Sequence, residues 1–199
     1  MKAKVFFASL VVLASGCSSI TPKTEVQTSY WIYDIQTDKS ASEVGTAVVE
    51  ALQSQMSSVN VSRNIPPSPL PYQAGRFQMS NALEKSNLGI LMANSGVSLQ
   101  MPICDGAIMI ASSQNSGMSN WGENTSANSC LWQYKGGYHL DIIVKFTNSS
   151  GGYDAKSLAK ALVNPVMGDS SQFIPTRINN ISNKLNAAGL KTTLVEKYP

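Results

Sequence analysis

The chain has 199 residues, a length that fits one domain with a hydrophobic core of its own. Charged residues make up only 14% of it, against roughly 25% in ordinary soluble domains, and the formal net charge is +3. No stretch gathers basic residues, so the sequence argues against nucleic-acid binding.

Residues 1–16 have the composition of a cleaved export signal. Lys2 and Lys4 precede an apolar run from Val5 to Leu13, after which small residues lead to Cys17. The run is too short to cross a membrane as a helix, which takes roughly 20 apolar residues, but it fits a signal peptide. We therefore expect residues 1–16 to be removed.

The end of this leader, Ala14-Ser15-Gly16-Cys17, resembles the lipobox of bacterial lipoproteins. The family usually has leucine where this chain has Ala14. In the family the leader is cut before the cysteine, which is then acylated, and several acyl chains give stable anchoring. The resemblance implies that Cys17 is lipidated in the bacterial cell envelope, and Ser18 favours the outer membrane. The alternative is an ordinary signal peptide that happens to precede a cysteine.

With Cys17 assigned to the lipid, Cys104 and Cys130 remain as a pair. In the oxidising compartments outside the cytoplasm such a pair normally forms a disulfide. We expect this disulfide to stabilise the fold by about 3–4 kcal/mol, because it closes a loop of moderate length. Two buried free thiols, or a metal-binding pair, are the alternatives.

The chain after the cysteine is polar up to residue 28 and contains Pro22. We interpret residues 17–28 as the lipidated cysteine with a tether, and residues 29–199 as a single α+β domain. Aromatic and β-branched residues from Tyr30 to Ile35 predict the first strand of that domain.

Ser40 and Glu43 have the spacing of a capping box, which predicts the start of a helix. The apolar residues that follow recur at helical spacing: Val44, Ala47, Val48, Ala51, Leu52 and Met56. A short strand is expected at 59–64. The prolines of residues 66–71 then force an extended segment, either a rigid strap over the domain or a polyproline surface for a partner.

A continuous apolar run at Gly106–Ala111 predicts a central strand, and the serine- and asparagine-rich residues 112–129 predict a long surface loop. Long loops on a rigid scaffold often carry binding. Trp121 has polar neighbours, so Asn120, Trp121 and Glu123 are the candidate binding residues for an envelope protein or a glycan. Alternatively, Trp121 packs back onto the domain.

Lys135-Gly136-Gly137 separates two strand-like segments, 131–134 and 138–147, and predicts a hairpin. Asp154 and then Ser170 or Ser171 are candidate helix starts, Gly189 is a candidate helix stop, and a last strand is expected at 190–195. The order of elements predicts an α+β fold: an antiparallel sheet with about three helices mainly on one face. It is compatible with a ferredoxin-like core that carries a large middle insertion.

His139 is the only histidine of the chain, which limits acid–base chemistry. Asp141 lies on the same face of the predicted strand, so a hydrolase would have to use His139 as its base. The simpler interpretation is a partly exposed pair on a solvated strand face. The sequence has no zinc-ligand spacing and no glycine-rich phosphate loop, and we expect no metal or cofactor.

These observations favour a lipid-anchored envelope protein that acts as a non-enzymatic binding or assembly module. A lipoprotein that binds a small ligand is the first alternative, and it predicts an apolar pocket between the sheet and the helices. A hydrolase that uses His139 is the second.

Overall fold

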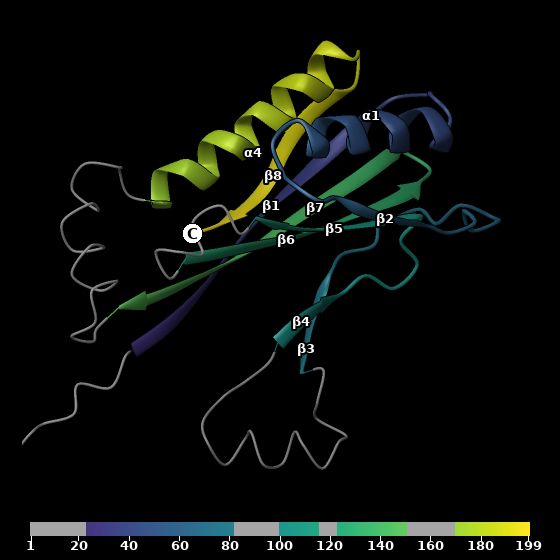
Figure 1. The fold of residues 1–199 in the computed structure, drawn as a ribbon. Helices are drawn as coiled ribbons and strands as arrows, with labels where there is room; N and C mark the ends of the chain where they lie inside the picture. Colours follow the sequence, from purple (N-terminus) through teal and green to yellow (C-terminus); the bar gives the residue numbers. More distant parts are fainter. Residues whose placement is uncertain (1–22, 82–99, 116–122, 151–169) are drawn as a thin grey trace, which may run out of the picture.

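The computed structural model describes residues 23–81, 100–115, 123–150 and 170–199 (Figure 1). Cys17, Asn120, Trp121 and the helix expected after Asp154 lie outside these ranges. The helices and strands, in chain order, are β1 (Lys23–Gln36), α1 (Ala41–Gln53), β2 (Asn60–Arg63), β3 (Gln78–Asn81), β4 (Gln100–Ile103), β5 (Met109–Asn115), β6 (Glu123–Tyr134), β7 (Gly137–Ser150), α4 (Ser170–Ala187) and β8 (Lys191–Tyr198).

One six-stranded sheet organises the molecule, with the strand order β2-β5-β6-β7-β1-β8 and every neighbouring pair antiparallel. Strands β3 and β4 form a separate two-stranded sheet. The hairpin predicted around residues 135–137 is confirmed, with Tyr134 of β6 opposite Gly137 of β7. Gly137 has a φ of 137°, and a side chain there would meet the carbonyl oxygen of Ile35.

The two helices of the described residues, α1 and α4, pack together on one face of the six-stranded sheet (Figure 1). The capping box of α1 is confirmed, because Ser40 Oγ accepts from the Glu43 N–H and Glu43 Oε2 accepts from the Ser40 N–H. Gly189 ends α4 with a φ of 77°, and the Leu190 N–H donates to the carbonyl of Leu185.

The main core lies between these helices and the sheet. Its helix residues follow the predicted spacing, and its strand residues alternate along each strand. They include Val44, Val48, Ile181 and Leu185 from the helices, and Trp31, Tyr33, Ile35, Leu131, Tyr138, Leu140 and Ile142 from the strands. Burial on this scale supplies the main driving force for folding.

A smaller cluster lies on the opposite face of the sheet, away from the helices. The predicted disulfide between Cys104 and Cys130 is confirmed there, with a Cα–Cα distance of 6.1 Å, and Trp132 packs beside it. Residues 71–77, which we call the strap, cross this face. Gly75 lies against the ring of Trp132 so closely that a Cβ at residue 75 would come within 2.4 Å of it.

The prediction of a long surface loop at residues 112–129 is wrong. Strand β5 continues to Asn115, and β6 begins at Glu123. Serine and asparagine side chains led to the error, because they are common in loops. In these strands Ser112, Ser126 and Asn128 point away from the helices. They alternate with residues that are buried on the helix side: Ser113, Ala127 and Ser129.

The fold is α+β-like, but its strand order is not that of a ferredoxin-like core. In that core a single strand separates the two strands that the first helix connects. Here α1 connects β1 to β2, and three strands, β7, β6 and β5, lie between them. The first strand also begins at Lys23 rather than Tyr30, so the described part of the expected tether pairs with β7.

Candidate functional site

A polar groove of about 450 Å³ lies on the sheet face away from the helices. Two rows of side chains that run across neighbouring strands form its floor, since residues paired in an antiparallel sheet point to the same face. Asn60, Ser112 and Asn128 form the first row, on β2, β5 and β6. Gln114, Ser126 and Lys145 form the second, on β5, β6 and β7.

The wall of the groove comes from the small sheet. Met101 and Pro102 of β4 line the groove, and Met101 is 52% exposed. The groove therefore combines a polar floor with an apolar side. A volume of this size falls in the range of pockets that bind small organic molecules, roughly 300–1,000 Å³.

Ligand recognition in this groove comes mainly from side chains. Strands β6 and β7 have a strand neighbour on both sides, and β5 has one as far as Ser112, so most of the backbone groups of the floor are engaged within the sheet. The asparagine and glutamine amides each offer donors and an acceptor, and the serine hydroxyls offer both as well. The floor can thus bind a ligand that is rich in hydroxyl groups.

Of the described residues that line the groove, Lys145 alone is charged. Burial lowers the pKa of its ammonium group, and no charged neighbour contributes to that shift. No carboxylate of the described residues forms an ion pair with it. Within the part of the chain that the structure describes, no acidic side chain therefore compensates the positive charge in the groove.

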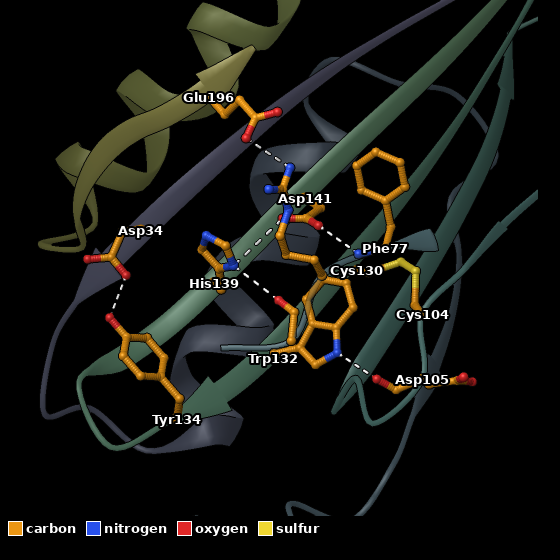
Figure 2. Close-up of polar contacts among 12 residues, drawn as sticks. Asp34, Phe77, Cys104, Asp105, Cys130, Trp132, Tyr134, His139, Asp141 and Glu196 are labelled. Carbon is orange, nitrogen blue, oxygen red and sulfur yellow. Dashed lines mark hydrogen bonds and ion pairs between the residues drawn. A yellow bond between two sulfur atoms is a disulfide. The ribbon is translucent and has the colours of Figure 1, made fainter. Parts of the chain in front are cut away.

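His139 and Asp141 lie on the same sheet face, beneath the strap (Figure 2). The sequence interpretation of a solvated pair is wrong, because Asp141 is completely buried. Its Oδ2 accepts from the Phe77 N–H at 3.0 Å, while its Oδ1 has no hydrogen-bond partner and lies 3.9 Å from His139 Nδ1. Burial raises the pKa of the Asp141 carboxyl, against the opposing effect of the Phe77 N–H.

The described contacts of this pair attach the strap to the sheet. His139 Nδ1 lies 3.1 Å from the carbonyl oxygen of Gly75, an acceptor that requires the proton on Nδ1. Together with the Phe77 bond, this contact holds residues 75–77 over β7. No contact of His139 among the described residues joins it to a serine, threonine or cysteine side chain.

A polar cluster at the surface ties the strap to β8 as well. Arg76 forms an ion pair with Glu196 at 3.0 Å, and the Tyr30 hydroxyl donates to the same carboxylate at 2.6 Å. These two hydrogen bonds lower the pKa of Glu196. Because the pair is exposed, we expect it to orient the strap more than to stabilise the fold.

The hollow between the sheet and the helices is much smaller. It measures about 30 Å³ and is lined by residues such as Met56, Val144 and Ile178. This is space for a water molecule rather than for an organic ligand. Within the described residues, the apolar pocket expected of a lipoprotein that binds a small ligand is therefore not found.

The candidate binding residues from the sequence are only partly placed. Asn120 and Trp121 lie outside the described residues, and Glu123 begins β6 opposite Asn148 of β7. The groove was missed, although its signal was present: Ser112 and Gln114, and likewise Ser126 and Asn128, alternate at the period of a strand.

Among the described residues, no three His, Cys, Asp or Glu side chains are grouped so that they could hold a metal ion. The same residues include no helix with the length and apolar character needed to span a membrane. No protein-family model matches the chain, and neither a curated protein nor a solved structure matches it.

Proposed function

We propose that this chain is a lipid-anchored protein of the bacterial cell envelope whose domain binds a glycan in the polar groove. The leader and Cys17 support the anchor through their resemblance to lipoproteins, with the outer membrane as the favoured location. The groove supports the binding function and is the observation on which the proposal depends.

A glycan suits this groove better than a polypeptide does. An extended polypeptide usually binds a sheet by adding a strand at an edge, where backbone groups are free. Most of the groove lies over strands that are paired on both sides, and only the end of β5 beyond Ser112 lacks a partner on its β2 side. Its amide and hydroxyl side chains match sugar hydroxyls, and Met101 offers an apolar surface to the C–H face of a sugar ring.

Binding of isolated envelope polysaccharide by the purified domain tests the proposal. Asn128→Trp places a large ring on the groove floor, so we expect it to weaken binding by at least about tenfold. Asn183→Trp is the matched control, because Asn183 is an exposed residue of α4. Equal binding by the two variants, or no binding by the unaltered domain, would contradict the proposal.

The anchor is tested separately by mass spectrometry of the mature protein. We expect a first residue Cys17 that carries acyl chains, and a Cys17→Ser variant that is released from membranes by salt washing. A mature chain that starts elsewhere, or an unmodified Cys17, would refute the anchor without touching the groove.

A further inference from the structure

Among the described residues, one positive charge lines the groove, and no described carboxylate pairs with it. Lys145 of β7 is half-buried, and its cross-strand partners are Thr28 of β1 and Ser126 of β6. Both partners are uncharged. The ion pairs of the described residues join Arg76 to Glu196 and His139 to Asp141, and neither involves Lys145.

A half-buried ammonium group without a partner costs folding free energy, because burial removes part of its hydration. The lowered pKa of Lys145 reflects the same loss of hydration. A bound anion would compensate for it, since hydrogen bonds between charged groups are stronger than those between neutral ones. The neutral amides and hydroxyls around it would still be free to bind hydroxyl groups.

We propose that the groove binds an acidic saccharide, with a sugar carboxylate on Lys145 and sugar hydroxyls on the surrounding amide and serine side chains. A carboxylate matches the site because its single negative charge equals the single positive charge of the lining residues. The inference rests on the proposed glycan-binding function and adds the chemical class of the glycan.

Paired probes test the charge. Tetrasaccharides that contain glucuronic, galacturonic or muramic acid are each compared with their methyl esters, which keep the hydroxyl groups and lose the charge. We expect the unaltered domain to bind at least one acid at least about tenfold more tightly than its ester. This preference should shrink as the salt concentration rises, because salt screens the charge.

Lys145→Met should bring the ratio of acid to ester affinity close to one, since methionine keeps most of the side-chain length but carries no charge. Lys197→Met is the control: it makes the same change of net charge on β8, where Lys197 pairs with Trp31 on the helix side of the sheet. We expect this control to keep the preference of the unaltered domain.

The outcomes separate the two proposals. Equal binding of acid and ester, abolished by Asn128→Trp, would refute the acidic ligand and leave the glycan site standing. A preference for the acid that survives in Lys145→Met would also refute the role of Lys145. Binding of neither member of any pair would contradict both proposals.

Discussion

The two faces of the six-stranded sheet differ in how they are closed. On the helix face, α1 and α4 cover an apolar core that leaves a hollow of only about 30 Å³. On the other face, the strap and the disulfide cover one part, and a polar groove of about 450 Å³ remains beside it. One set of strands therefore supports a buried apolar core on one side and an open polar groove on the other.

The contrast predicts that stability is unequally divided between the faces. Leu140 of β7 is fully buried on the helix face, so Leu140→Ala should lower the free energy of unfolding by about 2–5 kcal/mol. Ser126→Ala on the groove floor should change it by less than about 0.5 kcal/mol. Urea denaturation of both variants provides the measurement, and similar losses would contradict the division.

The disulfide should matter next most, because it holds the strap face. Replacing Cys104 and Cys130 together by alanine should cost about 2–4 kcal/mol, for a sequence separation of 26 residues. Adding a reductant should lower the melting temperature of the unaltered domain to about that of the double variant. The melting temperature of the double variant itself should not change with reductant. A reductant effect on the double variant would show that the loss has another origin.

Asp141 should give the smallest change and the clearest pH signature. Its pKa is raised above the ordinary value of 3.8, so its contribution to stability is present at acid pH and lost as the pH rises through the raised pKa. Asp141→Asn keeps the acceptor for the Phe77 N–H and does not ionise. At neutral pH we expect the free energy of unfolding of this variant to equal or exceed that of the unaltered domain. At acid pH we expect the variant to be less stable relative to the unaltered domain.

This prediction is measured as the difference in unfolding free energy between the two proteins from about pH 4 to pH 8. Comparing the two cancels the titration of Glu43 and Glu196, whose pKa values are lowered. A difference that is flat with pH would mean that Asp141 has an ordinary pKa. A difference of opposite slope would mean that the ionised carboxylate stabilises the strap.

Local sequence patterns predicted the helix face well. The capping box at Ser40, the helix stop at Gly189 and the hairpin around residues 135–137 are each confirmed. Short-range geometry determines these three features, so a single sequence carries enough information. The disulfide followed from cysteine counting instead, and it is also confirmed.

The strap face was harder to predict, because its contacts join distant parts of the chain. Phe77 and Asp141 are 64 residues apart, and nothing near His139 in the sequence shows that a strap covers it. Alternation along a strand predicts which residues share a face of the sheet, but not whether that face is exposed to solvent or covered by another part of the chain. The polar residues of β5 and β6 were interpreted as a loop because of their composition, so their place on the floor of a groove was not predicted.

If Cys17 carries a lipid, the early start of β1 limits how far the domain can stand from the membrane. Lys23 is already paired with Ser150, and it lies only six positions after Cys17 along the chain. Fully extended, that stretch reaches at most about 20 Å. Thr28 lies five positions further along β1, opposite Lys145. If Cys17 carries the lipid, the groove opens in the layer next to the headgroups, and a polymer anchored deeper in the envelope would have to approach that layer to be bound.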